Sequence, residues 1–244
     1  LADYPREKIE VVGMPHFDYY TNSPRLSREE LSKKLGISTD RKIILFLMIG
    51  LSGERLDGYV TSAIEDWIAD NPELKDFELV VRPHPNTAKS IRVGKNTKVN
   101  YPKIVEFKSD RITDREFTRE DLDIYASLIA HSKAIVSYQG TSIVDAAALG
   151  KPIICIAFDE EKNLPYLKGI KHQYEYSHLQ PILVTGGVKI VYNEGELKGA
   201  ILDSDKNPDK DLEARKKIVE EQCFKLDGLA SRRVVEEIKK SLNK

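Results

Sequence analysis

The chain has 244 residues, 32% of them charged, and the two signs nearly cancel to a formal net charge of -1. This balance argues against general binding to nucleic acid or to an anionic membrane surface. A hydrophobic content of 41% is enough for a packed core. The two cysteines, Cys155 and Cys223, have neither metal-ligand spacing nor the pattern of a disulfide framework, so we expect a cytoplasmic protein.

The first forty residues differ in pattern from the middle of the chain. Residues 9–12 predict a short strand, and a loop follows at Gly13-Met14-Pro15. The spacing Ser27-x-x-Glu30 predicts a helix that begins with a capping box. We expect residues 1–40 to be a linker between domains with a helix that leads into the next one. Because the chain does not begin with Met, we also expect it to be an excised piece or a processed product of a longer protein.

From residue 41 onward, apolar runs alternate with helical patterns. The runs that predict strands are residues 43–48, 77–81, 104–107, 134–137, 152–157 and 189–191. Such alternation is typical of a doubly wound parallel sheet, so we predict a Rossmann-like α/β domain over residues 41–225. Apolar residues at helical spacing continue to the end of the chain and predict a closing C-terminal helix over residues 226–244.

The segment 137–145 is the strongest candidate for a ligand site. Gly140 allows a ligand to approach the backbone, and Thr141 and Ser142 offer hydroxyl groups where a helix begins. This arrangement favours phosphate binding, and Asp145, one turn further, is placed to reach a ribose diol. The alternative is structural, because Ser142-x-x-Asp145 also fits a capping box.

Four loops that follow predicted strands are expected to converge at one edge of the sheet, namely residues 50–55, 82–86, 139–145 and 158–161. In the second loop His84 lies between two prolines and is placed to donate to a phosphate oxygen or a leaving group; a turn residue is the alternative. Arg55 and Arg82 are candidate counter-charges for phosphate, with a surface salt bridge or a solvated side-chain tip as the alternative for each. Gln139 is a further candidate phosphate ligand.

No metal site is expected. The remaining histidines, which are His16, His131, His172 and His178, lack ligand spacing with acids or cysteines. Asp159 is compatible with Mg²⁺, but solvated loop acids are commoner. The sequence has no Walker loop, no Gly-x-Gly-x-x-Gly fingerprint and no Ser-His-Asp order, which argues against P-loop ATPases, dehydrogenases and hydrolases.

Taken together, several segments resemble the C-terminal, donor-binding half of GT-B glycosyltransferase-type enzymes, from about residue 9 to residue 242. They are residues 12–15, 82–86, 140–152 and 227–231. Two branches are similar: polymer synthases that use CDP-glycerol or related donors, and non-hydrolysing UDP-N-acetylglucosamine 2-epimerases. The epimerases tend to carry a Ser-Gly-Gly turn and two consecutive acids. This chain has Gln139-Gly140-Thr141 and Val144-Asp145 instead, which favours the transferase branch.

The resemblance implies that Gly140, Thr141 and Ser142 hold the diphosphate of a UDP- or CDP-linked donor, that Asp145 binds its ribose and that His84 is catalytic. It also implies an N-terminal GT-B domain that this chain lacks, a glycan or lipid-linked acceptor, no separate cofactor and a location in the cytoplasm or at the inner face of the cell membrane. The expected function is transfer of a glycosyl or polyol-phosphate group in cell-surface polysaccharide biosynthesis. An epimerase and a non-catalytic nucleotide-sugar-binding module are the alternatives.

Overall fold

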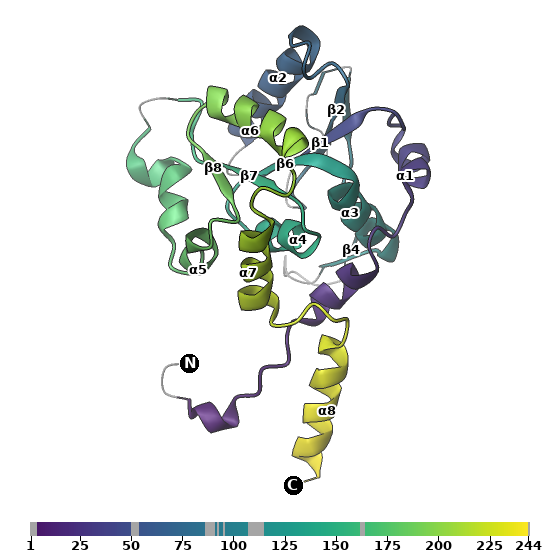
Figure 1. Ribbon diagram of the computed structural model, residues 1–244, viewed down its shortest axis with the longest axis vertical. Coiled ribbons are helices and arrows are strands. Elements are labelled where there is room, and N and C mark those ends of the chain that lie inside the picture. Colours follow the sequence, from purple (N-terminus) through teal and green to yellow (C-terminus); the bar gives the residue numbers. More distant parts are fainter. Residues whose placement is uncertain are drawn as a thin grey trace.

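A six-stranded parallel sheet forms the centre of the protein (Figure 1). The computed structural model describes residues 4–49, 54–85, 91, 93–94, 96–106, 115–161 and 164–243, apart from the side chains at positions 54, 55, 106 and 115. The strands lie in the order β3-β2-β1-β6-β7-β8. Their bounds are Lys42–Leu47 (β1), Phe77–Arg82 (β2), Thr97–Val99 (β3), Ser132–Ser137 (β6), Ile153–Ile156 (β7) and Lys189–Val191 (β8). The chain builds outward from β1 to β3 and then returns to β6, so the strand order reverses between β1 and β6.

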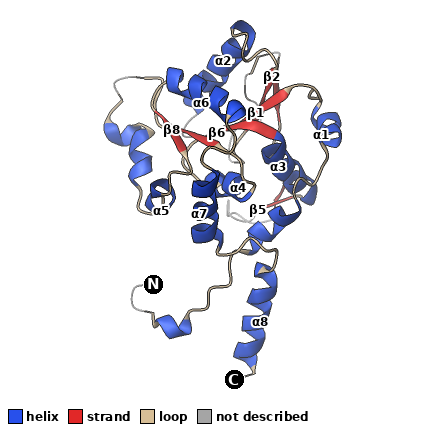
Figure 2. Cartoon of the chain, viewed as in Figure 1, coloured by secondary structure: helices blue, strands red, loops and turns tan. Residues whose placement is uncertain are grey.

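Helices cover both faces of the sheet, as Figure 2 shows. On one face α2 (Glu54–Asp70) packs against α6 (Glu194–Lys206), and on the other α3 (Arg119–His131) packs against α4 (Ser142–Ala148). All six residues of β2 are buried, as are five of six in β1. Strands that are buried on both sides have continuous apolar runs, which is why the sequence pattern identified them. The predicted Rossmann-like α/β fold is therefore confirmed.

The strand predicted at residues 9–12 was wrong, because these residues form no strand. The run at 104–107 does contain a strand, Ile104–Glu106 (β4), but it pairs with Arg115–Phe117 (β5) in a separate antiparallel pair and not in the main sheet. The edge of the main sheet next to β2 is formed by β3, which pairs with β2. Val105 is 47% exposed, so the short apolar run at β4 does not mark a core strand.

The remaining helices include α1 (Arg28–Leu35), α5 (Gln180–Val184), α7 (Leu212–Cys223) and α8 (Ala230–Leu242), and the 3-10 helices are η1 (Arg6–Lys8), η2 (Pro15–Asn22), η3 (Tyr166–Lys168) and η4 (Lys171–Glu175). The predicted capping box of α1 is confirmed, because the side chains of Ser27 and Glu30 bond each other's backbone N–H groups.

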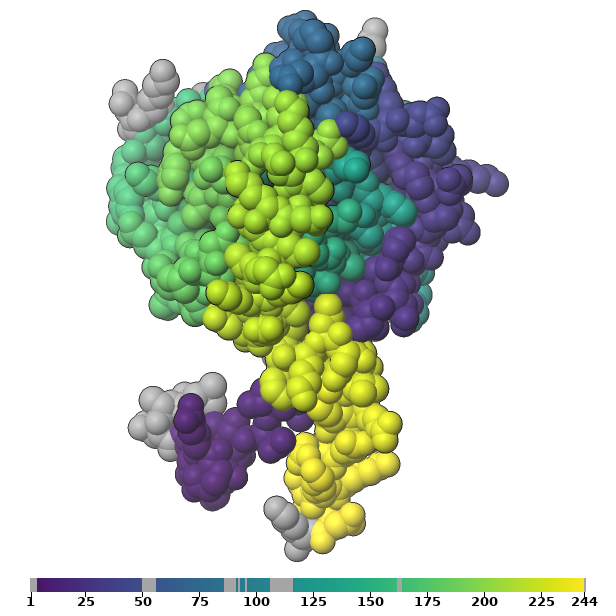
Figure 3. Space-filling model, in the orientation of Figure 1, coloured from purple at the N-terminus to yellow at the C-terminus, as the bar shows by residue number. Residues whose placement is uncertain are grey.

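The helix η2 contacts α8, and in Figure 3 the N-terminal and C-terminal segments both project from the body of the protein. Asp18 of η2 accepts the backbone N–H groups of Ala230 and Ser231 at 2.9 and 2.8 Å. Phe17 and Tyr20 of η2 are buried in the core, so this part of the N-terminal segment packs firmly on the body. The predicted domain boundaries at residues 40 and 225 stay a prediction.

Candidate functional site

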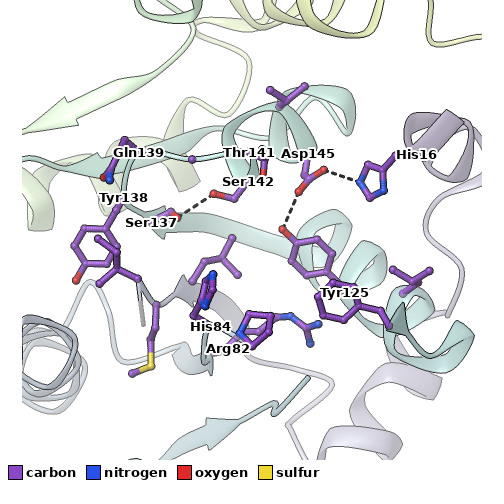
Figure 4. Close-up of a pocket in the computed structure, with 18 of the residues that line it drawn as sticks. His16, Arg82, His84, Tyr125, Ser137, Tyr138, Gln139, Thr141, Ser142 and Asp145 are labelled. Atoms are coloured by element: carbon purple, nitrogen blue, oxygen red, sulfur yellow. Dashed lines mark hydrogen bonds and ion pairs between the residues drawn. The ribbon is translucent and has the colours of Figure 1, made fainter. Parts of the chain in front are cut away.

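A cavity of about 620 Å³ lies at the carboxyl ends of β1, β2 and β6 (Figure 4). Its walls include residues 47–49 after β1, residues 82–85 after β2 and residues 137–142 after β6. In open α/β sheets, ligands bind where the strand order reverses. The cavity lies at that point, and the expected convergence of the loops after β2 and β6 is what the structure has. The loop at residues 158–161 does not line this cavity, so its expected convergence was wrong. Residues 50–53 and 86–90 lie outside the described part of the chain, as does the side chain of Arg55.

The turn between β6 and α4 leaves open space beside its backbone. A Cβ added at Gly140 would have no heavy atom within 4 Å. The first helical N–H is that of Ile143, which donates to the Gly140 carbonyl, so the N–H groups of Thr141 and Ser142 precede the helical ladder. Such N–H groups are suited to an anion.

The alternative capping-box interpretation of this turn was wrong. Thr141 rather than Ser142 occupies the N-cap position, and it makes no side-chain cap hydrogen bond. The Ser142 hydroxyl lies 3.1 Å from that of Ser137. Phosphate binding by Gly140, Thr141 and Ser142 stays a prediction.

Asp145 is held by three side chains of the protein, of which Figure 4 shows His16 and Tyr125. Its Oδ1 accepts the Tyr20 hydroxyl at 3.0 Å and lies 3.3 Å from His16 Nε2, and its Oδ2 accepts the Tyr125 hydroxyl at 3.0 Å. Burial, together with the Asp145 charge, raises the pKa of both tyrosines, which therefore stay neutral. Because both carboxylate oxygens already accept protein donors, this geometry does not favour the ribose contact, which stays a prediction.

Arg82 is 7% exposed and forms an ion pair with Asp121, which is fully buried. It also donates to the side-chain oxygen of Asn100, and its guanidinium lies 4.9 Å from the centre of the Tyr125 ring. The expected alternative of a surface salt bridge was therefore wrong, because the pair is buried. Arg82 lines the cavity, but its charge is already balanced by Asp121. Phosphate contact by Arg82 stays a prediction.

His84 and Gln139 face the cavity from two different loops. The exposed His84 side chain follows Arg82 and Pro83 on the loop after β2, and partial burial lowers the pKa of its imidazole. Gln139 donates its side-chain N–H to Gln173 of η4, which joins the cavity wall to the segment after β7. The catalytic role of His84 and the phosphate contact of Gln139 stay predictions.

Sequence reasoning missed His16, Tyr20 and Tyr125. His16 lines the cavity beside Asp145, although 129 residues separate the two in sequence. No spacing rule connects residues so far apart, and the only local signal was the Gly13-Met14-Pro15 loop just before His16.

Asp159, the candidate Mg²⁺ ligand, accepts the backbone N–H of Ile170 with both oxygens at 3.1 Å. Within the ranges described above, no group of three or more His, Cys, Asp or Glu side chains is placed to hold a metal ion. In the same ranges, no helix combines the length and apolar character needed to cross a bilayer.

Solved structures similar to this chain share its fold. The wall teichoic acid polymerase TagF is 18% identical with a TM-score of 0.60, over 98% of this chain and 54% of that one. The UDP-GlcNAc 2-epimerase from Neisseria meningitidis, bound to UDP-GlcNAc, is 18% identical with a TM-score of 0.56, over 98% of this chain and 56% of that one. The same identity and TM-score apply to S. aureus MnaA in a structure with UDP, over 99% of this chain and 56% of that one. The chain thus spans about half the length of these structures.

No curated protein sequence matches the chain. A match to a protein family covers residues 3–240, which is nearly the whole chain. Together with the solved structures, it confirms the resemblance to a GT-B-like glycosyltransferase-type domain. The chain belongs to the CDP-glycerol:poly(glycerophosphate) glycerophosphotransferase family.

Proposed function

We propose that the chain binds a nucleotide-activated donor and forms the donor half of a transferase that moves a polyol-phosphate or glycosyl group during wall polymer synthesis. CDP-glycerol is the expected donor, because the family is described by that substrate. A UDP-linked sugar is the alternative. One observation carries the proposal: the open turn at Gly140, with the N–H groups of Thr141 and Ser142, lines the same cavity as His84.

The proposed step is a phosphoryl transfer. The acceptor hydroxyl oxygen forms a bond to the phosphorus that carries glycerol, the bond from that phosphorus to the bridging oxygen breaks, and CMP leaves with the electron pair. The hydroxyl proton passes to a base. The turn N–H groups stabilise the charge that grows on the departing phosphate. The lowered pKa of His84 leaves its imidazole neutral near pH 7, with one ring N–H to donate to the same phosphate.

We propose that the acceptor site and the base lie on a part of the full-length enzyme outside this chain. We propose that a glycan or lipid-linked acceptor binds to an N-terminal GT-B domain, and that the full-length enzyme works in the cytoplasm at the inner face of the membrane. The chain spans about half of the similar solved structures. We therefore expect the chain alone to bind donor and to turn it over slowly.

The test is a calorimetric titration of the chain with CDP-glycerol, CDP, CMP and UDP-N-acetylglucosamine. We expect the two pyrophosphate-containing cytidine ligands to bind more tightly than CMP. Gly140→Val should weaken CDP-glycerol binding by about tenfold or more, because its side chain fills the space that the pyrophosphate needs. The matched control is Gly199→Val, since Gly199 in α6 also has no heavy atom within 4 Å of an added Cβ. Equal affinities of the two variants for CDP-glycerol would contradict phosphate binding at the Gly140 turn.

A second measurement separates a catalytic domain from a purely binding module. His84→Ala in the full-length enzyme should abolish most turnover of CDP-glycerol and leave donor affinity within a few-fold of wild type. Unchanged turnover would rule out a catalytic role for His84. Conversion of UDP-N-acetylglucosamine without an acceptor would support the epimerase alternative.

A further inference from the structure

The N-terminal segment brings a histidine to the wall of the cavity. His16 belongs to η2, whose Phe17 and Tyr20 are buried and anchor the helix on the body. The His16 ring makes edge contacts with both, at centroid distances of 5.1 and 5.5 Å. Its side chain is 44% exposed and lines the cavity, so a ligand there can reach it.

The Asp145 carboxylate favours the protonated form of His16. The carboxylate is 9% exposed as a side chain, and two of its three partners are the neutral hydroxyl groups of Tyr20 and Tyr125. The third partner is His16. A buried carboxylate favours a cation beside it. Accordingly, the hydrogen bond from His16 to Asp145 raises the pKa of His16, although partial burial of the ring opposes this.

The other charged groups around this pair are balanced or neutral. Arg82, across the Tyr125 ring, is paired with Asp121. On the α7 side, burial together with the Asp145 charge raises the pKa of the Cys223 thiol to about 12, so the thiol stays protonated. His84, on the opposite loop, has a lowered pKa because of burial.

The helix α8, which also packs against η2, brings one further cation. Arg233 of α8 is paired with Asp227 and donates to the Val12 carbonyl. Asp18 of η2 is occupied by the N–H groups at the start of α8. In the described part of the chain, His16 is therefore the basic group that contacts Asp145 at the cavity.

We propose that His16 binds the phosphate of the nucleotide-activated donor as an imidazolium, with Nε2–H donated to Asp145 and Nδ1–H donated to the ligand. This inference rests on the proposed function, because it requires the cavity to hold such a donor. An imidazolium has two N–H donors, and the contacts of His16 with described side chains use only Nε2. The cation would act together with the turn at Gly140 to favour a pyrophosphate over an uncharged nucleoside.

The experiment is a calorimetric titration of the 244-residue chain with CDP-glycerol at pH 5.5, 6.5, 7.5 and 8.5. CDP-glycerol is the appropriate probe because its pyrophosphate is esterified at both ends and holds a constant charge over this range. The terminal phosphate of CDP titrates near pH 6 and would obscure the result. Wild type is compared with His16→Gln and His16→Arg, and with His178→Gln as a control, because His178 is an exposed histidine that does not line the cavity.

Wild-type affinity should fall by about tenfold as the pH rises through the raised pKa of His16, because a hydrogen bond from a cation is lost. His16→Gln should bind about tenfold more weakly at pH 5.5 and show a much smaller fall. His16→Arg should keep its affinity at pH 8.5, and His178→Gln should follow wild type. Any slope that remains in His16→Gln is assigned to His84 with the double variant His16→Gln/His84→Gln.

If His16→Gln matches wild type in affinity and pH profile, His16 does not bind the donor, although donor binding itself stands. If folded wild type binds no CDP-glycerol at any pH, the proposed function and this inference both fail. A second measurement uses the wild-type chain alone, so it does not depend on the folding of any variant. NMR titration of the His16 ring should show a higher pKa with CDP-glycerol bound than without it, because a bound anion favours the protonated ring. An unchanged pKa on binding overturns the inference.

Discussion

The guanidinium of Arg82 donates hydrogen bonds to both carboxylate oxygens of Asp121 at the wall of the cavity. This buried pair joins the last residue of β2 to the first turn of α3, and Asp121 also accepts the backbone N–H of Lys103 at 2.9 Å. The loop that carries His84 begins immediately after Arg82. The pair therefore sets the direction in which that loop leaves the sheet.

Asp121→Ala should lower the free energy of unfolding by about 3–5 kcal/mol, because it leaves the Arg82 charge buried without a partner. The matched control is Glu120→Ala at the neighbouring position, where the carboxylate is exposed and pairs with Lys34 and Lys103. Exposed pairs contribute little, so this variant should unfold close to wild type. Urea denaturation monitored by circular dichroism measures both. Similar losses in the two variants would contradict the argument.

Tyr125→Phe should lower the free energy of unfolding by about 1–3 kcal/mol, because Asp145 Oδ2 loses its donor in a buried place. Tyr176→Phe is the control, since Tyr176 is 46% exposed and its hydroxyl can bond water instead. The same urea experiment applies. If Tyr125→Phe is as stable as wild type, the Asp145 oxygen is not shielded from water, and the case for a proton on His16 weakens with it.

Ser27 and Ser142 each precede an acidic residue by three positions, but their substitution by alanine should affect stability differently. Ser27→Ala should lower the free energy of unfolding by about 1 kcal/mol, because Ser27 accepts the Glu30 backbone N–H at 3.2 Å as an N-cap. Ser142→Ala should cost clearly less, since Ser142 lies inside α4 and its hydroxyl contacts Ser137. Thermal unfolding of the two variants side by side provides the test. A larger loss for Ser142→Ala would restore the capping interpretation of the β6–α4 turn.

Features that depend on neighbours in sequence could be predicted, and features that depend on distant partners could not. Local patterns identified five of the six core strands, because a strand buried on both faces needs a continuous apolar run. The strand predicted at residues 104–107 forms outside the main sheet, and β3 (Thr97–Val99) takes the sixth place instead. Pairing of short strands is decided by tertiary partners, and β3 has a lysine at its centre and no apolar run. The capping motif of Ser27 depends only on neighbours in sequence, whereas the Asp145 carboxylate bonds Tyr20 and His16 of a distant segment.

The cavity itself was predictable in outline only. The rule that ligands bind at the carboxyl ends of parallel strands correctly grouped the loops of His84 and Gly140. The same rule is silent on what else reaches that edge. His16 arrives there on η2, which belongs to none of the βα units, so its position follows from packing of Phe17 and Tyr20 rather than from any periodicity.

The two histidines of the cavity should affect stability with opposite dependence on pH. The pKa of His16 is raised by its hydrogen bond to Asp145, and that of His84 is lowered by burial. The stabilisation from His16 is fully present below the unfolded-state pKa of about 6.5 and is lost as the pH rises through the raised folded-state pKa. For His84 the unfolded chain binds the proton more readily, so stability is present above about pH 6.5 and falls as the pH drops through the lowered folded-state pKa.

Consequently, His16→Gln should be less stable than wild type at pH 5, and the difference should shrink by pH 8. His84→Gln should gain stability relative to wild type as the pH falls from 8 to 5. Both rings are partly exposed, so each effect should stay below about 1 kcal/mol. Urea unfolding at four pH values measures both slopes, and His178→Gln corrects for the general effect of losing a histidine. Slopes of the same sign in the two variants would show that Asp145 does not hold the proton on His16.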